Sequence, residues 1–205
     1  MNLSHHTASS RRGSAAHWPV FCARPFLISV MIALSLFSAP ISRAQSSKPT
    51  DYQVKAIYLY NFGRFIEWPA SASKNDSFLV CVLGRDPFGS ALDRAFAGEN
   101  IGGKHIAAKR ISTLQESAGC QILFLSGTEE SRAKQILEAL DKEAVLTVSD
   151  MPLFSERGGM IQFVSDGNRI RFEVNLAATQ RAGLTLSSEL IRVASAVRKN
   201  SAGGD

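Results

Sequence analysis

The chain contains 205 residues, with 23 Lys and Arg against 18 Asp and Glu and a formal net charge of +5. All 18 acidic residues but only 19 of the basic ones follow Ala44, so the segment after this residue carries a net charge of +1 with its signs interspersed. A nucleic-acid-binding protein needs a basic stripe to neutralise phosphates, so this composition argues against a nucleic-acid partner. Residues 45–205 are sufficient for one domain with a sizeable core.

Residues 1–44 have the organisation of a secretory signal peptide. Arg11, Arg12 and Arg24 form a basic leader, residues 26–37 (FLISVMIALSLF) an uncharged apolar core, and Ser42 and Ala44 offer small residues for cleavage. The apolar core would rise roughly 18 Å as a helix, well short of the ~30 Å hydrocarbon layer, which favours a cleaved leader over an uncleaved anchor. We therefore predict an exported protein without a permanent membrane span, with residues 45–205 as its single folded domain.

Two cysteines remain after the leader. Cys22 is lost with it, and Cys81 and Cys120 form an even pair in an oxidising compartment. We expect a disulfide between them, which would remove roughly 4 kcal/mol of unfolded-chain entropy in the simplest loop model. The alternative is a pair of buried free thiols.

The hydrophobic pattern predicts an α/β domain. Thr50 and Gln53 have the spacing of a capping box before a helix that should run to about Trp68, where Pro69 follows. Apolar runs predict buried strands, and amphipathic stretches between them predict helices that connect parallel strands. We expect strands at 78–83, 104–111 (near a sheet edge), 122–125 and 145–148, and helices at 91–97 and 129–140.

The C-terminal part should form a hairpin followed by helices. Residues 160–165 and 169–175 alternate with a period of two, and Asp166, Gly167 and Asn168 suit a tight turn. Helices are expected at 176–182 and 187–199. The predicted fold is thus a mixed, mostly parallel central sheet with helices on both faces and a C-terminal hairpin plus helix.

Few residues after the leader could support catalysis. His105 is the one histidine after the leader, and no nucleophile motif accompanies it, so a Ser-His-Asp triad is not expected. A zinc site would lack His and Cys ligands once the two cysteines form a disulfide. The loop 84–90 lacks the Lys of a phosphate loop. Carboxylate pairs remain as an alternative, but they fall on predicted turns and helix starts, where capping explains acids. These pairs are Asp86 with Asp93 and Glu129 with Glu130. We predict neither an enzyme nor a metal or cofactor site.

Two sets of residues are candidates for binding. Phe65, Glu67, Trp68 and Pro69 have the composition of a partner-binding patch, with an aromatic stripe packed on the sheet as the alternative. Arg85, Arg169 and Arg171 could hold an anionic ligand. For the two hairpin arginines the alternative is a solvated cross-strand charge pattern.

Several stretches together resemble the YfiR family of bacterial periplasmic proteins. They are residues 54–56 (VKA), 60–62 (YNF), 65–69 (FIEWP), 81–89 (CVLGRDPFG), 145–148 (VLTV), 158–161 (GGMI), 169–176 (RIRFEVNL) and 182–188 (AGLTLSS). The resemblance implies an α/β fold, a tendency to dimerise and no enzymatic activity. Cys81 and Cys120 match the cysteine pair of the family, whereas a second pair found in some members is missing, because residues 151–164 contain no Cys.

The resemblance also implies a function. Its best-known members repress a membrane-bound diguanylate cyclase by binding the periplasmic domain of that enzyme, which lowers cyclic di-GMP. We therefore expect a periplasmic regulator whose partner is an inner-membrane receptor, with a homodimer as its own assembly. The alternative function is a periplasmic sensor that binds a small anion or a nucleotide without catalysis.

Overall fold

The computed structural model describes residues 49–72 and 75–199, so the predicted signal peptide at 1–44 lies outside the described residues. Within these ranges no helix is both long enough and apolar enough to cross a membrane. Eight strands form the main sheet in the order β10-β8-β7-β6-β5-β2-β4-β3. They are β2 (Ser77–Leu83), β3 (Asn100–Ile101), β4 (Lys104–Ile111), β5 (Ile122–Leu125), β6 (Leu146–Ser149), β7 (Ile161–Asp166), β8 (Arg169–Asn175) and β10 (Ala196–Arg198).

The sheet is mostly parallel, as the alternation of strands and helices predicts. Only β3 with β4 and β7 with β8 pair antiparallel, and the other neighbours pair parallel. β4 has only the two residues of β3 on its outer side, so its expected place near an edge is confirmed. The hairpin is also confirmed, since Asp166 pairs with Arg169 across a turn in which Gly167 has a φ of 57°.

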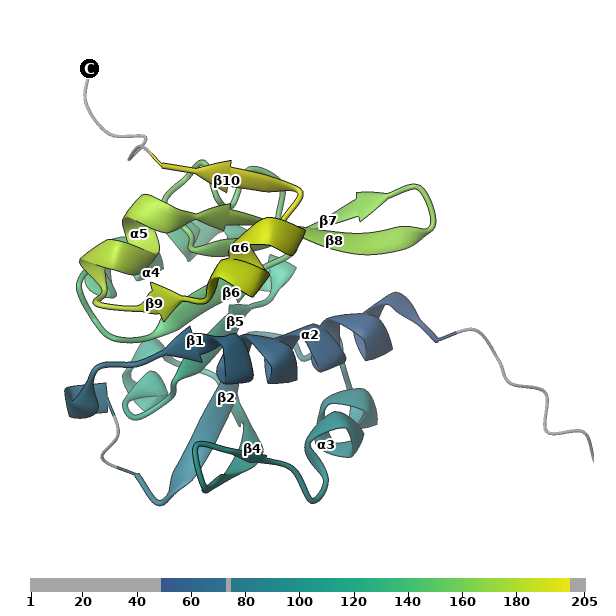
Figure 1. Cartoon of the computed structure of the whole chain (residues 1–205), viewed down its shortest axis with the longest axis vertical. Helices are drawn as coiled ribbons and strands as arrows, with labels where there is room; N and C mark the ends of the chain where they lie inside the picture. Colours follow the sequence, from purple (N-terminus) through teal and green to yellow (C-terminus); the bar gives the residue numbers. More distant parts are fainter. Residues whose placement is uncertain (1–48, 73–74, 200–205) are drawn as a thin grey trace, which may run out of the picture. The chain divides into compact units, whose positions relative to one another are not determined.

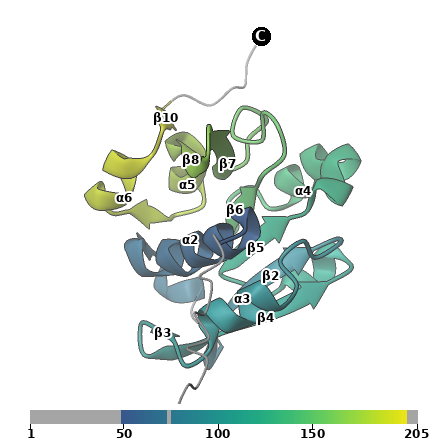
Figure 2. The ribbon, with the colours of Figure 1, turned by 90° about the vertical axis from the view of Figure 1, so that its right-hand side faces the viewer.

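Helices cover both faces of the sheet (Figure 1). Figure 2 shows α2 and α4 on either side of β5 and β6. The helices are α2 (Asp51–Phe65), α3 (Ser90–Phe96), α4 (Ala133–Ala139), α5 (Leu176–Arg181) and α6 (Ser188–Val193). Short 3-10 turns lie at Ala70–Ala72, Leu114–Ser117 and Gly127–Arg132. The predicted helix at 129–140 is therefore a 3-10 turn followed by α4.

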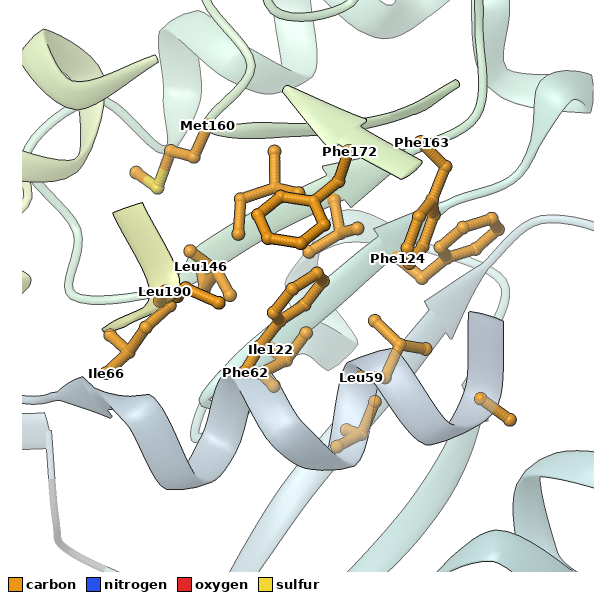
Figure 3. Packing of buried hydrophobic residues seen from close by; sticks show 14 of the residues in the cluster. Leu59, Phe62, Ile66, Ile122, Phe124, Leu146, Met160, Phe163, Phe172 and Leu190 are labelled. Carbon is orange, nitrogen blue, oxygen red and sulfur yellow. The ribbon is translucent and has the colours of Figure 1, made fainter. Parts of the chain in front are cut away.

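Alternate strand residues build two cores. On β2, Phe78, Val80 and Val82 join the cluster beneath α2, whereas Cys81 and Leu83 join the cluster beneath α4. Phe62 of α2 is the centre of the first cluster, with its ring centroid 5.8 Å from that of Phe163 and 5.2 Å from that of Phe172 (Figure 3).

The expected disulfide is present between Cys81 and Cys120, whose Cα atoms lie 6.0 Å apart. Cys81 lies on β2, and Cys120 lies just before β5, the neighbouring strand. Both residues are buried in the second core cluster. The predicted adjacency of the two apolar strands is the reason that the cysteines meet.

Two predicted helix ends are wrong. α2 stops at Phe65 rather than near Trp68, because Ile66 and Glu67 form β1 (Ile66–Glu67), which pairs antiparallel with β9 (Thr185–Leu186). The last helix ends at Val193 rather than at 199, and Ala196–Arg198 form β10 along β8. In each case the residues that follow the helix pair with a strand that is distant in sequence, so they adopt extended rather than helical geometry.

Candidate functional site

The predicted partner-binding segment leaves α2 through β1, and its side chains have different environments. Phe65 is 39% exposed, and Glu67 is also exposed. Trp68 and Pro69 are half-buried. Strand geometry turns successive side chains to opposite sides, which separates buried Ile66 from Glu67. The structure thus leaves Phe65 and Glu67 as the accessible members of this set.

Trp68 has structural contacts. Its ring packs edge-on against Phe78, with 5.1 Å between centroids, and its indole Nε1 donates a hydrogen bond to the carbonyl oxygen of Gln121 at 3.2 Å. Its remaining surface lines a pocket of about 380 Å³ together with Ile66, Ile101 and other residues. Trp68 therefore joins the end of α2 to β2 and β5.

The outward face of α2 presents large apolar side chains. Ile57 is 53% exposed and Phe65 is 39% exposed, so the alternative of an aromatic stripe packed on the sheet does not hold for Phe65. The guanidinium of Arg64 lies 5.6 Å from the ring centroid of Tyr60 and 5.9 Å from that of Phe65. We call the set Ile57, Tyr60, Arg64 and Phe65 the α2 surface.

Helical spacing brings these four side chains to one side of α2. The buried side holds Ala56, Leu59, Phe62 and Gly63. Exposed aromatic side chains and arginine are the residue types enriched at protein interfaces. The sequence did not predict that Ile57, Tyr60 and Arg64 belong to an exposed surface. Apolar residues occur on both sides of this helix, so helical spacing alone does not separate the exposed side from the buried one.

The three arginines of the predicted anion site do not converge. Arg169 and Arg171 lie two residues apart on β8, whereas exposed Arg85 follows β2. Strands β5, β6 and β7 lie between β2 and β8 in the sheet. A single ligand site that uses all three arginines is therefore excluded.

Arg169 and Arg171 border a groove of about 560 Å³. Val54 and Tyr58 of α2 and Val193 of α6 also line this groove. The Tyr58 hydroxyl donates a hydrogen bond to the carbonyl oxygen of Ile170 at 3.3 Å, which joins α2 to β8. Tyr58 and Val193 were not predicted, because nothing local in the sequence indicates that three distant elements meet here.

The candidate carboxylate pair Asp86 and Asp93 surrounds a guanidinium. Arg110 Nε lies 2.9 Å from Asp86 Oδ2, and Arg110 Nη1 and Nη2 each lie 2.7 Å from an oxygen of Asp93. Hydrogen bonding by Arg110 lowers the pKa of Asp93 below its ordinary value. Both carboxylates therefore bind Arg110 and anchor α3 to β4.

The other Asp86 oxygen organises the loop before α3. Asp86 Oδ1 accepts a hydrogen bond from the Phe88 amide at 2.7 Å, and the buried Phe88 ring lies edge-on to Phe124 with 4.8 Å between centroids. Gly84 has a φ of +88°, and a Cβ at this residue would come within 2.5 Å of Thr128 Oγ1. Residues 84–90 therefore insert an aromatic side chain into the core.

The remaining titratable candidates are dispersed. Glu129 pairs with Arg132, and Glu130 lies 3.5 Å from Arg157. His105 is exposed on β4, opposite Ser77 of β2. Among residues 49–72 and 75–199, no group of three or more His, Cys, Asp or Glu side chains could hold a metal ion.

Comparison with known proteins adds a family match to this geometry. A family model described as YfiR/HmsC-like matches residues 52–195, which extend from the second residue of α2 to the residues after α6 and include the whole α2 surface. A comparison with curated proteins finds no match.

Proposed function

The chain belongs to the YfiR/HmsC-like family, and we propose that it is an exported, non-catalytic regulator that binds the periplasmic domain of a membrane signalling protein. The target favoured by the family resemblance is a membrane-bound diguanylate cyclase. Repression of this enzyme would lower cyclic di-GMP on the cytoplasmic side.

The observation that carries the proposal is the α2 surface. Ile57 and Phe65 expose apolar area on a helix whose opposite side is packed into the core, so the surface is held rigidly. Arg64, above the rings of Tyr60 and Phe65, is partly ordered before any partner arrives. A preformed patch of aromatic side chains and arginine loses little conformational entropy on binding.

A disulfide and a leader support the periplasmic location. The bond between Cys81 and Cys120 forms in oxidising compartments, of which the bacterial periplasm is one. The segment at 1–44 has the basic and apolar regions of an export signal.

Regulation by binding requires a difference in affinity. A repressor shifts its receptor toward an inactive conformation only if it binds that conformation more tightly than the active one. We propose that the α2 surface contacts a region of the receptor domain that differs between its two conformations.

The proposal is tested by titrating the purified exported protein with the periplasmic domain of a membrane-bound diguanylate cyclase from the same cell, by calorimetry. We expect saturable binding that Ile57→Asp and Phe65→Asp each weaken by about tenfold or more, because a charge enters an apolar contact. Leu153→Asp is the matched control, since Leu153 is 49% exposed in a loop beside the second core. Absence of binding by the unmodified protein contradicts the function, and equal binding by all variants contradicts the surface.

A further inference from the structure

We propose that the pocket lined by Trp68 binds a small carboxylate with a compact apolar body, and that this ligand competes with the receptor for Arg64. We call this pocket of about 380 Å³ the Trp68 pocket. The ligand site itself is independent of the proposed function, whereas the competition rests on it.

The walls of the Trp68 pocket are apolar and come from separate segments of the chain. Ile66 lies on β1, Phe78 on β2 and Ile101 on β3, and all three side chains are buried. Half-buried Trp68 completes this part of the lining. A volume of about 380 Å³ is at the lower end of the range for small-molecule sites, roughly 300–1,000 Å³. The pocket therefore suits a compact apolar group rather than a large ligand.

These walls are held in place before a ligand arrives. The Trp68 ring lies edge-on to Phe78, and its hydrogen bond to the Gln121 carbonyl oxygen fixes it there. Gly63, in the last turn of α2, also lines the pocket, and a Cβ at this residue would collide with Ile101 Cδ1. Ile101 thus packs directly on the backbone of α2. A preformed pocket loses little conformational entropy when it binds a ligand.

The charges at the Trp68 pocket favour an anion. Its lining contains the two cationic residues Arg64 and Lys104, and no Asp or Glu is among the described residues that line it. An anion in this pocket therefore meets two positive charges and no negative one.

A larger groove beside α4 and α5 has no such preference. This groove has a volume of about 900 Å³ and contains both acidic and basic side chains. Arg157 lies 3.5 Å from Glu130, and Arg181 lies 3.0 Å from Asp141. Because these charges already neutralise each other, the larger groove is the weaker candidate for a charged ligand.

Arg64 is the residue that we assign to the carboxylate. Among the described residues none of its N–H donors has a hydrogen-bond or ion-pair acceptor, and its contacts are with the rings of Tyr60 and Phe65. A guanidinium can donate two parallel hydrogen bonds to one carboxylate. We therefore place the carboxylate at Arg64 and the apolar body against Trp68.

The buried amide of the lining excludes a more polar ligand. Gln121 Oε1 accepts a hydrogen bond from the Leu79 amide at 2.7 Å. Gln121 Nε2 donates to the carbonyl oxygens of Ala72 and Gly119, both at 3.1 Å. The amide is therefore occupied, and the additional polar groups of a sugar or a nucleotide would lack partners against these walls.

Arg64 also belongs to the α2 surface, which links the two sites. A carboxylate that binds the guanidinium at the pocket withdraws its charge from a receptor group that approaches Tyr60 and Phe65. In addition, the Tyr60 hydroxyl donates a hydrogen bond at 2.6 Å to Glu99, the residue before β3, so the α2 surface contacts the segment that supplies a pocket wall. Because one cation serves two partners, the ligand and the receptor should weaken the binding of each other by the same factor.

The first test uses the fluorescence emission of Trp68. The chain contains two tryptophans, and Trp18 lies in the predicted leader, so Trp68 is the one tryptophan of the exported protein. This protein is titrated with hydrocinnamate, which joins a phenyl ring to a carboxylate by a short chain, and with the neutral amide and the amine of the same length. We expect a saturable change in emission, with the carboxylate bound at least about tenfold more tightly than the amide or the amine.

A charge variant locates the carboxylate. Arg64→Gln keeps a polar side chain at an exposed position, so we expect the fold to be unchanged and the affinity for hydrocinnamate to fall to that of the amide. Arg157→Gln is the matched control, because Arg157 is also exposed and its groove shares no lining residue with the Trp68 pocket. The site is overturned if hydrocinnamate leaves the Trp68 emission unchanged, if acid and amide bind equally, or if both variants weaken binding alike.

The tripeptide Gly-Gly-Phe distinguishes a free acid from a protein C-terminus, because it offers the same ring and carboxylate on a peptide chain. We expect weaker binding than that of hydrocinnamate, since the additional peptide groups would lack partners in a compact apolar pocket. Tighter binding of the tripeptide would overturn the assignment to a small molecule.

The second test measures the competition. The calorimetric titration with the periplasmic domain of the cyclase is repeated in a saturating concentration of hydrocinnamate. We expect the affinity for this domain to fall at least about fivefold in the unmodified protein, and the ligand to have no effect in Arg64→Gln. An unchanged affinity in the unmodified protein overturns the competition. If the domain does not bind even without the ligand, the proposed function fails and the competition fails with it, whereas the Trp68 emission still decides the ligand site.

Discussion

Lys55 Nζ lies 2.6 Å from Asp150 Oδ2, and this ion pair joins α2 to the end of β6. Only 10% of the Lys55 side chain and 18% of the Asp150 side chain are exposed. The Tyr52 hydroxyl donates a hydrogen bond to the same carboxylate oxygen at 2.9 Å, and the ammonium lies 4.2 Å from the centroid of the Tyr52 ring. These contacts fix the helix that carries the α2 surface.

Removal of one partner of this pair should be more damaging than removal of both. Asp150→Leu leaves the Lys55 ammonium buried without its counterion, and we expect it to lower the free energy of unfolding by about 3 kcal/mol. The double variant Lys55→Met/Asp150→Leu should lose clearly less, because no uncompensated charge remains. Urea unfolding of the exported protein measures both. Equal losses of the free energy of unfolding in the two variants would show that the unpaired Lys55 charge does not cause the destabilisation.

The same cluster predicts a dependence on alkaline pH. Burial and the hydrogen bond to Asp150 raise the pKa of Tyr52 to about 12, above the 10.0 of an unperturbed tyrosine. Because the folded state holds this proton more tightly than the unfolded state, the stabilisation is fully present below pH 10 and is lost as the pH rises toward 12. In an alkaline titration followed by tyrosinate absorbance, Tyr52→Phe should remove the step that occurs at the highest pH. The free energy of unfolding of the variant should also fall less between pH 10 and 12. If the variant keeps that step, it belongs to another tyrosine.

The disulfide should dominate the response to reduction. Cys81 and Cys120 are 0% and 2% exposed, so a reductant should reach the bond only after unfolding. Cys81→Ala/Cys120→Ala should lower the free energy of unfolding by about 4 kcal/mol, the loop-entropy value for a separation of 39 residues. Urea unfolding of the variant, compared with thiol labelling of the native protein in reductant, tests both statements. Rapid labelling in the absence of urea would contradict the buried position of the bond.

Arg110 should be the main anchor of α3. Arg110→Gln leaves Asp86 and Asp93 without their cation, and we expect a loss of about 1 kcal/mol, since Arg110 is one-third exposed and Asp93 is half-exposed. The pKa of Asp93 is lowered in the folded state, so its contribution is present above pH 4 and disappears as the pH falls through the folded pKa. The difference in the free energy of unfolding between the unmodified protein and Arg110→Gln should therefore become smaller at acidic pH. Lys134→Gln, at a side chain 88% exposed, is the control.

Local pattern was sufficient for much of the fold. On β2 a continuous apolar run predicted a strand buried on both faces, and the structure places its alternate side chains in two separate cores. The two wrong helix ends depend on pairings between distant residues, Ile66 with Leu186 and Ala196 with Glu173. No window of sequence around either end contains its partner strand, so helical spacing alone extended both helices too far.

The candidate site was less accessible to sequence reasoning. Residue type predicted a shared binding role for Phe65 and Trp68, yet the indole of Trp68 donates a hydrogen bond to Gln121, which lies 53 residues away in sequence. Arg169 and Arg171 could be placed together from period-two alternation, whereas their distance from Arg85 depends on strand order in the sheet. Side-chain exposure and strand order both depend on tertiary packing, so the sequence alone could not show which of the predicted residues lie together on one surface.

The most direct test of the regulatory function is the cyclic di-GMP content of cells that lack this protein. We expect deletion to raise cyclic di-GMP, the unmodified gene and the Leu153→Asp variant to restore the low level, and the Phe65→Asp variant to fail although it is exported in equal amount. A deletion strain whose cyclic di-GMP is unchanged would contradict the central claim.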